Sequence, residues 1–464
     1  MAGRTYDVVI LGGGPGGYVG AIRAGQLGLS VALVEKEALG GTCLHHGCIP
    51  SKAIIRHAEV LSLVKRAAEF GIKVDGFRAD FGQAIDRSQQ VIQKLHSGVR
   101  SLMKKNKVDV LSGVGKLAGK GRIAVSGAGA PGEVQGERIL IATGSRVKSL
   151  PGLNPDGNRV LTSNEALLNK RLPGSMAIIG AGAVGVEFAY VYNAYGVKIT
   201  LLEMMPQILP TEDAEVAATL TRAFKKQGIE VLTGHRLEGV EDRAQDFSLK
   251  IRSDQEAREL RAEGILVAVG RAPNSDGIGL ESVGVRTEKG FIEIDGSLKT
   301  SVPGIWALGD VTTRPALAHG ASAQGAWLME SFAGMDRPPI DPLAVPSATY
   351  CQPQVASVGM TEERARREGL DLKIGKFPFS ASGKAIALGE TEGFVKVVSD
   401  AKTGEILGAH IIGPEATELI GEFVLAKTLE STPLEIHKSI HPHPTLSEAL
   451  MEASGAVYRE AIHI

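Results

Sequence analysis

The segment Gly40-Gly41-Thr42-Cys43-Leu44-His45-His46-Gly47-Cys48-Ile49-Pro50-Ser51-Lys52 carries two of the three cysteines in this chain of 464 residues. Cys43 and Cys48 are separated by four residues, and a glycine-rich segment lies just upstream. A long chain with so few cysteines is typical of a reducing compartment, where the disulfides that do form are usually catalytic. We therefore interpret the two cysteines as a redox-active disulfide.

Two other interpretations of this segment stay open. His45 and His46 lie between the cysteines, so the segment could contribute to a metal site. Zinc normally needs two further ligands from a second cluster, however, and the third cysteine, Cys351, stands alone in the sequence. The pair could also be an inert structural disulfide or two buried thiols. We expect no metal.

The residues that follow predict a helix beginning near Cys48. Pro50 fits the first turn of a helix, because its missing N–H is not needed there. Apolar residues then recur at helical spacing, at Ile54, Ile55, Ala58, Leu61 and Val64. A cysteine at a helix N-terminus is favoured as thiolate, since the helix dipole stabilises the negative charge.

The composition excludes several classes of protein. The net charge is −1 and the chain has no basic block, which argues against nucleic acid as a partner. No run approaches the roughly 18 apolar residues of a membrane span, so we expect no membrane association. A strand pattern starts at Tyr6, which leaves no room for a signal peptide. We expect a cytoplasmic bacterial protein, or one of the mitochondrial matrix if a transit peptide has been removed.

Two glycine fingerprints predict two dinucleotide-binding folds. The first, Gly12-x-Gly14-x-x-Gly17, follows a strand pattern at Tyr6–Leu11, and Glu35 ends the next strand. The second, Gly180-x-Gly182-x-x-Gly185, is followed at the same spacing by Glu203. Such glycines allow a tight turn, approach of the backbone to a pyrophosphate and close helix packing, while the acid binds a ribose. Two sites imply two dinucleotides and a hydride passing between them.

The second fingerprint favours NAD over NADP. Glu203 can accept a hydrogen bond from a 2′-hydroxyl and would repel a 2′-phosphate. No arginine or lysine stands beside it in Met204-Met205-Pro206. The alternative is that Glu203 is only a solvated strand end.

Changes in composition predict the fold class. Leu150-Pro151-Gly152 separates the two dinucleotide regions. A glycine-rich pattern of strands and turns ends near Val345, and a pattern of strands and helices follows it. Two strands end in small polar or acidic residues, at Thr143-Gly144-Ser145 and at Gly309-Asp310, where a cofactor can pack. We predict an α/β chain with two Rossmann-like domains and a C-terminal α+β domain.

The segment His441-Pro442-His443-Pro444-Thr445-Leu446-Ser447-Glu448 predicts a capping box, S/T-x-x-E, that starts the last helix. The box would place Glu448 where it can hold His443, and a carboxylate–histidine pair makes a base near neutral pH. A surface loop without a catalytic role is the alternative. His441 is the weaker candidate, because no carboxylate lies at a comparable fixed spacing.

Together these motifs resemble the flavoprotein family of class I pyridine nucleotide-disulfide oxidoreductases over nearly the whole chain. The similarity includes the cysteine segment, both fingerprints, the strand ends at Ala142–Ser145 and Gly309-Asp310, and the terminal His-Pro-Thr-Leu-Ser-Glu. Ile49-Pro50-Ser51-Lys52 is similar to the branch that oxidises dihydrolipoamide, and the C-terminus lacks the cysteine pair of the mercuric reductases.

The resemblance implies an enzyme that oxidises protein-bound dihydrolipoamide to lipoamide and reduces NAD+ to NADH. Cys43 would exchange with the substrate, Cys48 would lie next to tightly but non-covalently bound FAD, and His443, held by Glu448, would be the base. Lys52 would lie near the reactive edge of the flavin, paired with Glu187; an ordinary helix-face lysine is the alternative. The implied contacts also include the fingerprint glycines Gly12, Gly14, Gly17, Gly180, Gly182 and Gly185, and the strand-end residues Thr143, Gly144 and Ser145. The other implied contacts to FAD are Glu35, Gly115, Asp310, Ala316, Leu317, Ala318 and His319. The other implied contacts to NAD are Glu203 and Gly270.

The same resemblance implies the domain organisation and the partners. Residues 1–149 would form the first part of the FAD-binding domain, 150–271 the NAD-binding domain, 272–345 a central segment completing the FAD region, and 346–464 the interface domain. The interface domain would build a homodimer in which His443 serves the disulfide of the second subunit. The partners would be lipoyl domains of 2-oxoacid dehydrogenase or glycine cleavage complexes.

The chain departs from the family pattern in two places. His45-His46 stands where relatives commonly have Asn-Val, and the lysine and acidic residues that often follow His319 are missing from residues 317–321. Two other functions remain as alternatives. One is another NAD(P)H-dependent reductase of a small disulfide, and the other is a non-catalytic subunit docked in a 2-oxoacid dehydrogenase complex.

Overall fold

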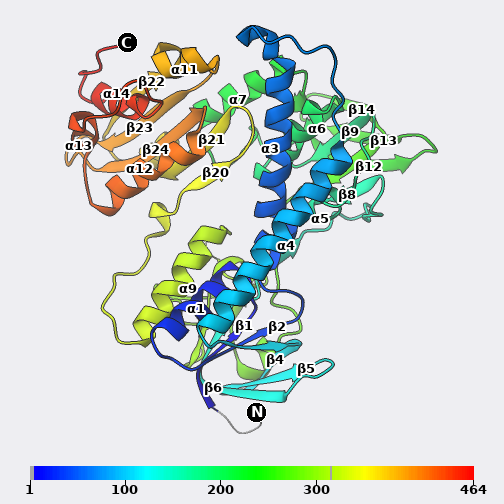
Figure 1. Ribbon diagram of the computed structural model, residues 1–464, viewed down its shortest axis with the longest axis vertical. Coiled ribbons are helices and arrows are strands. Elements are labelled where there is room, and N and C mark those ends of the chain that lie inside the picture. Colours follow the sequence, from blue (N-terminus) through cyan, green and yellow to red (C-terminus); the bar gives the residue numbers. More distant parts are fainter. Residues whose placement is uncertain (1–4, 314–315) are drawn as a thin grey trace. The chain divides into compact units, whose positions relative to one another are not determined.

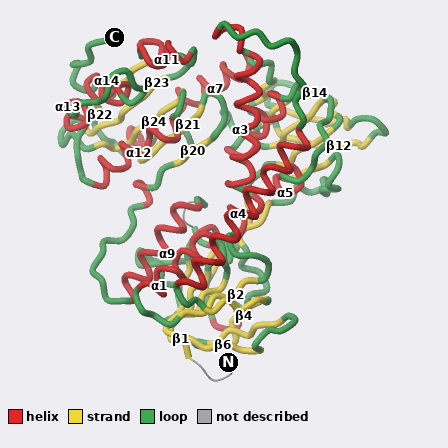
Figure 2. The backbone as a smooth tube through the Cα atoms, in the orientation of Figure 1, coloured by secondary structure: helices red, strands yellow, loops and turns green. Residues whose placement is uncertain are grey.

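The computed structural model describes residues 5–313 and 316–464, which form two compact units that alternate along the chain. Unit 1 comprises the described residues of segments 1–53, 83–148 and 270–342. Unit 2 comprises segments 54–82, 149–269 and 343–464. Figure 1 labels the elements, and Figure 2 distinguishes helices, strands and loops by colour.

Unit 1 is built on a sheet with β1 (Thr5–Leu11) at its centre. β1 lies parallel to β2 (Val31–Glu35) and to β6 (Gly132–Ile141). β1 and β2 are apolar runs buried on both faces, as is typical of parallel strands, whereas only the end of β6, at Ile139–Ile141, is continuously buried. The strand order is β3-β2-β1-β6-β5-β4, and β19 also pairs with β6. The remaining strands of this sheet are β3 (Asp109–Ser112), β4 (Val114–Gly119), β5 (Arg122–Ser126) and β19 (Ile305–Ala307).

Two helices of unit 1 pack closely against each other through glycine. α1 (Pro15–Gln26) lies beside α9 (Ala318–Phe332), as Figure 1 shows. A Cβ atom on Gly325 of α9 would clash with the carbonyl oxygen of Gly16 on α1. The close approach places α9, which begins with the predicted FAD contacts Ala318 and His319, against the helix that follows the first fingerprint.

The cysteine segment folds into two helices. α2 (Gly41–His46) carries Cys43 and was not predicted, because six residues are too few to show a helical period. α3 (Cys48–Lys65) begins at Cys48 as predicted and continues from unit 1 into unit 2. The next α-helix along the chain is α4 (Phe81–Lys105).

The part of unit 2 that contains the second fingerprint repeats the parallel strand pairing seen at the centre of unit 1. Its parallel sheet has the order β11-β10-β9-β15-β8, and β9 (Ser175–Ile179) precedes the second fingerprint as β1 precedes the first. The other elements are β8 (Val160–Thr162), α5 (Ser163–Ala166), α6 (Ala183–Ala194), β10 (Lys198–Leu202), α7 (Ala214–Lys226), β11 (Glu230–Leu232), β12 (Arg236–Asp242), β13 (Phe247–Arg252), β14 (Ala257–Ala262) and β15 (Gly264–Val267).

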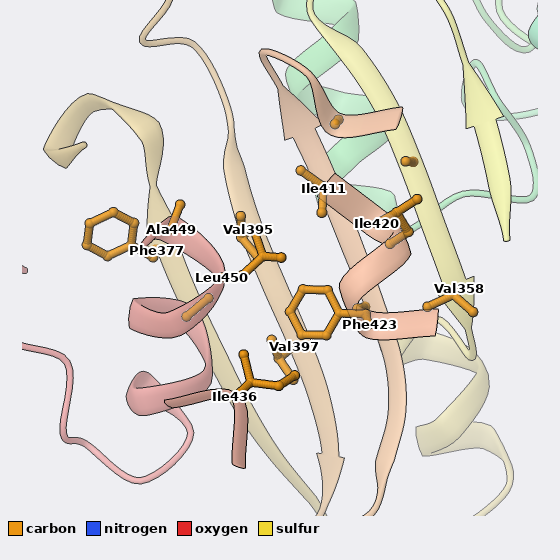
Figure 3. Close-up of a cluster of buried hydrophobic side chains, with 14 of the residues drawn as sticks. Val358, Phe377, Val395, Val397, Ile411, Ile420, Phe423, Ile436, Ala449 and Leu450 are labelled. Carbon is orange, nitrogen blue, oxygen red and sulfur yellow. The ribbon is translucent and has the colours of Figure 1, made fainter. Parts of the chain in front are cut away.

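The C-terminal part of unit 2 is an antiparallel sheet of order β20-β21-β24-β23-β22 with helices on it. Figure 3 shows Phe423 and Leu450, from two different helices, on the same side of the sheet as Val395 and Val397. The elements are β20 (Ser347–Thr349), β21 (Gln354–Gly359), α10 (Glu362–Arg367), β22 (Leu372–Pro378), α11 (Gly383–Leu388), β23 (Phe394–Asp400), β24 (Ile406–Gly413), α12 (Ala416–Thr428), α13 (Pro433–Lys438) and α14 (Glu448–Ala456).

The two sheets with parallel strands at their centres, of which the sheet in unit 1 also has the antiparallel pairs β4–β5 and β5–β6, and the C-terminal antiparallel sheet with its helices confirm the predicted fold class. Among the described residues, no helix has the length and apolar character needed to cross a membrane. Short elements complete unit 1, namely β7 (Ser145–Val147), β16 (Arg271–Pro273), α8 (Leu280–Val283), β17 (Thr287–Glu288) and β18 (Phe291–Ile292).

Candidate active site

Cys43 and Cys48 form a disulfide in unit 1. Their Cα atoms are 4.6 Å apart, within the usual range for a bridged pair. Cys43 lies on α2, and Cys48 is the first residue of α3, where the helix dipole favours negative charge. The predicted pairing is present, at the predicted helix end.

The helix that carries Cys43 rests on the first fingerprint loop. Gly40 caps α2 in a left-handed conformation, and its N–H donates to the carbonyl oxygen of Gly13 at 2.8 Å. A Cβ atom on Gly41 would lie 2.6 Å from the Cα of Gly14, so this position requires glycine. The loop that we predict to bind FAD therefore also positions the disulfide.

Both fingerprints have the same local geometry. Gly12 has φ +109°, and a Cβ atom there would clash with the carbonyl oxygen of Ala142 at the end of β6. Gly180 has φ +100°, and a Cβ atom there would lie 2.5 Å from the carbonyl oxygen of Ala268, just after β15. Each first glycine thus leaves a cradle at the carboxyl edge of a parallel sheet, the place where dinucleotides bind in this fold class.

The acids at the two strand ends are held in the same way. One carboxylate oxygen of Glu35 accepts the N–H of Gly13 at 2.6 Å, and one of Glu203 accepts the N–H of Ala181 at 2.8 Å. The second oxygen of Glu203 accepts the N–H of Met205 at 2.9 Å. Glu203 is buried and doubly hydrogen-bonded, so it is more than a solvated strand end.

The two predicted FAD strand ends meet in unit 1. The hydroxyl of Ser145 donates to the carboxylate of Asp310 at 2.6 Å. The guanidinium of Arg271 donates to the Ser145 hydroxyl and to the Ser145 carbonyl oxygen, each at 2.7 Å, and lies 3.9 Å from the Asp310 carboxylate. Burial lowers the pKa of Arg271, and the charge of Asp310 opposes that shift.

The sequence interpretation missed Arg271 and Asn274. Asn274 donates its side-chain N–H to the carbonyl oxygen of Thr143 at 3.0 Å, and the Thr143 hydroxyl donates to the Asn274 carbonyl oxygen at 2.7 Å. Both residues stand within four positions of Gly270, in Gly270-Arg271-Ala272-Pro273-Asn274. The available signal was a basic residue and an amide just after Gly270, which was itself predicted to contact a cofactor.

The remaining predicted cofactor residues occupy distinct places. Gly115 is buried in β4, where a Cβ atom would clash with Leu11. Residues 316–319, Ala316, Leu317, Ala318 and His319, lead into α9. Lys52 lies on α3 in unit 1, whereas Glu187 is buried on α6 in unit 2 and accepts the N–H of Tyr350 at 3.0 Å. The pairing of Lys52 with Glu187 stays a prediction.

The predicted histidine–carboxylate pair is formed in unit 2. His443 Nδ1 lies 2.8 Å from Glu448 Oε1, and Glu448 Oε2 accepts the N–H of Thr445 at 2.7 Å. Burial alone would raise the pKa of the Glu448 carboxyl. The hydrogen bonds from Thr445 and His443 outweigh burial and hold that pKa below its usual range. The His443 side chain is 80% exposed, so a substrate can reach it.

The predicted capping box at this site is half wrong. Glu448 does accept the N–H of Thr445, but α14 begins only at Glu448, with Ser447 before it and no side-chain cap. The Thr445 hydroxyl donates to the carbonyl oxygen of Pro442 at 2.7 Å and lies 2.9 Å from the hydroxyl of Ser447. The hydroxyl half of the predicted box, in which this oxygen accepts a backbone N–H of the helix, is not formed.

His441, the weaker candidate because no carboxylate lies at a fixed local spacing, has a carboxylate partner from a distant segment. His441 Nε2 lies 2.9 Å from Glu422 Oε1 on α12, and its Nδ1 lies 3.0 Å from the carbonyl oxygen of Ser439. The His441 side chain is only 7% exposed. The partner stands 19 residues upstream, so no local spacing in the sequence could indicate it.

Other candidate ligands do not gather into a metal centre within the described ranges, where no three or more His, Cys, Asp or Glu side chains form a group suited to a metal ion. Cys351 is buried, and its thiol donates to the carbonyl oxygen of Pro353 at 3.1 Å. The ring of His45 contacts the ring of His96 on α4.

Comparison with known proteins is consistent with this geometry. Residues 6–325 match the family described as pyridine nucleotide-disulphide oxidoreductase, and residues 345–454 match its dimerisation domain. The chain is 47% identical over 473 residues to the dihydrolipoyl dehydrogenase of Bacillus subtilis, and 46% identical over 463 residues to that of Zymomonas mobilis, with 99% of each chain covered in both cases.

Among solved structures, LpdA from Mycobacterium tuberculosis matches with a TM-score of 0.90 at 27% identity, covering 96% of this chain and 98% of that one. A Cu(II) complex of the HOCl-induced flavoprotein disulfide reductase RclA from Escherichia coli matches with a TM-score of 0.86 at 28% identity, covering 97% and 99%.

Proposed function

The chain belongs to the pyridine nucleotide-disulphide oxidoreductase family, and we propose that it oxidises dihydrolipoamide to lipoamide with NAD+ as the electron acceptor. One observation carries the proposal. The Cys43–Cys48 disulfide stands at the start of α3 in a chain that is 47% identical, over 99% of its length, to a dihydrolipoyl dehydrogenase. A disulfide at a helix N-terminus is suited to exchange with a dithiol, because the departing sulfur leaves as a stabilised thiolate.

The residues present fit two dinucleotide cofactors. The cradle at Gly12, the acid Glu35 and the cluster of Ser145 with Asp310 fit FAD, and the cradle at Gly180 with Glu203 fits NAD. When bound, FAD supplies the route by which an electron pair passes from the reduced disulfide to NAD+. The protein's own residues bind and orient the two cofactors and carry the thiol chemistry.

The thiol chemistry needs a nucleophile, a leaving group and a base. His443 takes a proton from one thiol of dihydrolipoamide, and the resulting thiolate attacks the sulfur of Cys43. The Cys43–Cys48 bond breaks, and Cys48 leaves as the thiolate at the start of α3. The second substrate thiol then attacks the substrate sulfur of the mixed disulfide, and its proton passes to Cys43 as that sulfur leaves. Lipoamide is released, and Cys43 remains as the thiol and Cys48 as the thiolate. Two electrons have passed from the substrate to the protein.

His443 is proposed to act across a homodimer. The match to the dimerisation domain covers residues 345–454, which include His443 and Glu448. His443 is exposed on its own chain, and its Nε2 is the nitrogen that Glu448 does not use. A second copy of the chain would bring its disulfide to this base, so that each active site would need two subunits.

The wider setting follows from the substrate. Dihydrolipoamide on lipoyl domains of 2-oxoacid dehydrogenase or glycine cleavage complexes is the proposed natural partner, and the cytoplasm is the proposed location. We also retain the domain limits at residues 149, 271 and 345 as proposals. Relatives named dihydrolipoyl dehydrogenase at 47% and 46% identity favour this substrate over another small disulfide.

The test is an anaerobic titration with dihydrolipoamide, followed by addition of NAD+ and detection of NADH at 340 nm. The wild-type protein is expected to form NADH, and Cys43→Ser is expected to lose this activity while retaining its yellow cofactor. Cys351→Ser is the matched control, since Cys351 lies outside the disulfide. Retained lipoamide turnover in Cys43→Ser would overturn the mechanism, and preference for glutathione disulfide with NADPH would support the alternative reductase.

A further inference from the structure

Two histidines from different helices contact one carbonyl oxygen just before α2, the helix that carries Cys43. His45 Nε2 lies 2.9 Å from the carbonyl oxygen of Leu39, and His96 Nδ1 lies 3.1 Å from the same oxygen. A carbonyl oxygen only accepts, so both nitrogens carry hydrogen. The two rings also contact each other edge-on, with centroids 5.2 Å apart. His45 lies on α2 and His96 lies on α4, and both belong to unit 1.

Leu39 stands at the junction between the first fingerprint loop and α2. Its side chain is 7% exposed and packs against Gly13, and the next residue, Gly40, donates its N–H to the Gly13 carbonyl oxygen. α2 starts directly after this junction and carries Cys43. Two donors occupy both lone pairs of the Leu39 carbonyl, so this peptide is held from α2 and α4 at once.

We propose that His45 and His96 are positioning residues for the Cys43–Cys48 disulfide, because together they hold the Leu39 carbonyl and thereby fix the start of α2. The inference deepens the proposed dithiol–disulfide function and rests on it. Two cysteines held at bonding distance have a high effective concentration, which favours the disulfide over the dithiol. Loss of the two hydrogen bonds would loosen Cys43 and favour the dithiol.

The geometry provides matched substitutions for each histidine. The amide nitrogen of asparagine occupies about the position of histidine Nδ1, so His96→Asn keeps the donor to Leu39. The amide nitrogen of glutamine occupies about the position of histidine Nε2, so His45→Gln keeps the donor to Leu39. The exchanged variants, His96→Gln and His45→Asn, have the same polarity but place the donor at the wrong distance. His96→Leu and His45→Leu remove the donor altogether.

The experiment equilibrates the FAD-loaded protein with mixtures of oxidised and reduced dithiothreitol under anaerobic conditions. Dithiothreitol loses two electrons and two protons to form its cyclic disulfide, while the Cys43–Cys48 bond becomes two thiols. The reaction is stopped by alkylation, and mass spectrometry measures the reduced fraction of Cys43 and Cys48. This gives the equilibrium constant for reduction, without dihydrolipoamide and without NAD.

We expect the leucine variants and the exchanged amide variants to shift the equilibrium at least about fivefold toward the dithiol, and His96→Asn and His45→Gln to remain within about twofold of wild type. The exchanged amides keep the test decisive if a leucine variant does not fold. Exchanged variants that behave as wild type, or matched variants that shift as far as leucine, would overturn the inference.

A control variant tests whether the chemical change alone has an effect. His235 Nδ1 lies 2.8 Å from the carbonyl oxygen of Thr233, so His235→Asn makes the same replacement on a histidine that does not contact Leu39. Its equilibrium constant should equal that of wild type. Because dithiothreitol is the reductant, a protein that failed to oxidise dihydrolipoamide would still report on the two histidines.

Discussion

The guanidinium of Arg271 lies 3.4 Å from the hydroxyl of Thr42, the residue before Cys43, and 2.7 Å from the hydroxyl of Ser145. One half-buried cation therefore connects the redox segment with the strand end that we propose to bind FAD. Asp310 is the carboxylate beside it, at 3.9 Å, and Ser145 donates to that carboxylate. The four residues form one hydrogen-bonded group.

Arg271→Met should weaken FAD binding by about 10- to 100-fold. Methionine keeps the apolar stem but loses the donors to Ser145, and charged hydrogen bonds of this kind contribute about 1.5–3 kcal/mol each. The measurement is a fluorescence titration of the cofactor-free protein with FAD. Arg286→Met, which loses only an exposed pair with Glu293, is the control and should bind FAD as wild type does. Equal affinity in both variants would contradict the assigned role.

Glu448→Gln should lower the rate of dihydrolipoamide oxidation about 10²-fold or more, because the carboxylate that holds the ring of His443 is lost. Burial raises the pKa of Glu448, but the hydrogen bonds from Thr445 and His443 hold it below its usual range, so the group is a carboxylate in a neutral assay. Glutamine has one acceptor oxygen and no charge, so it cannot accept from Thr445 with one oxygen and from His443 with the other. Measurement of kcat/KM from pH 5.5 to 9 checks this, and a variant as fast as wild type across that range would exclude the positioning role of Glu448.

Glu203→Gln should reduce the preference for NAD+ over NADP+ by about tenfold or more, because the repulsion of a 2′-phosphate disappears. Glutamine keeps one acceptor for the N–H groups of Ala181 and Met205 and should leave the loop folded. The ratio of kcat/KM for the two nucleotides is the readout. Glu35→Gln is the control at the equivalent strand end, and its ratio should not change.

Lys396→Met should destabilise unit 2 by about 3–5 kcal/mol, since a buried carboxylate loses its partner. The Lys396 side chain is 2% exposed, and its Nζ lies 2.7 to 3.0 Å from three carboxylates, those of Asp213, Glu215 and Glu362. Burial opposes its charge, but hydrogen bonds to Glu362 and Glu215 raise the pKa of Lys396 to about 12. Thermal unfolding at neutral pH measures the loss.

The pH dependence of that loss has a defined sign. Because the pKa of Lys396 is raised, its contribution is present below its unfolded value and disappears as pH rises through about 12. The hydrogen bond from Lys396 lowers the pKa of Glu362, so the carboxylate contribution disappears as pH falls through the acidic range. The difference between wild type and Lys396→Met should therefore be largest at neutral pH and shrink in acid. A constant difference would contradict the ion-pair explanation.

Local patterns in the sequence predicted the features that depend on neighbouring residues. The strand before Gly12, the start of α3 at Cys48 and the contact of Glu448 with His443 are of this kind. Each is set by hydrophobic period, by proline geometry or by a spacing of a few residues.

Contacts between distant segments could not be predicted in the same way. Glu422 on α12 contacts His441, and His96 on α4 contacts Leu39, because each helix packs against a loop that is distant in the sequence. Arg271 illustrates the same limit, since its partner Ser145 stands on a strand that pairs with β16 only after the chain has returned from unit 2. One sequence records each residue but not the partner that tertiary packing assigns to it.

The alternation of the two units along the chain has a consequence for synthesis on the ribosome. β6 of unit 1 completes its pairing only with β19, and unit 1 closes only with segment 270–342, after all of segment 149–269 has been made. The edge of β6 that β19 later covers is therefore an unpaired strand edge during much of translation, and unpaired edges recruit other strands. Nascent chains stalled between residues 150 and 300 should accordingly be the most prone to aggregate and the most dependent on chaperones. In chains extended beyond residue 342, β19 can pair with β6, and this strand edge is no longer exposed.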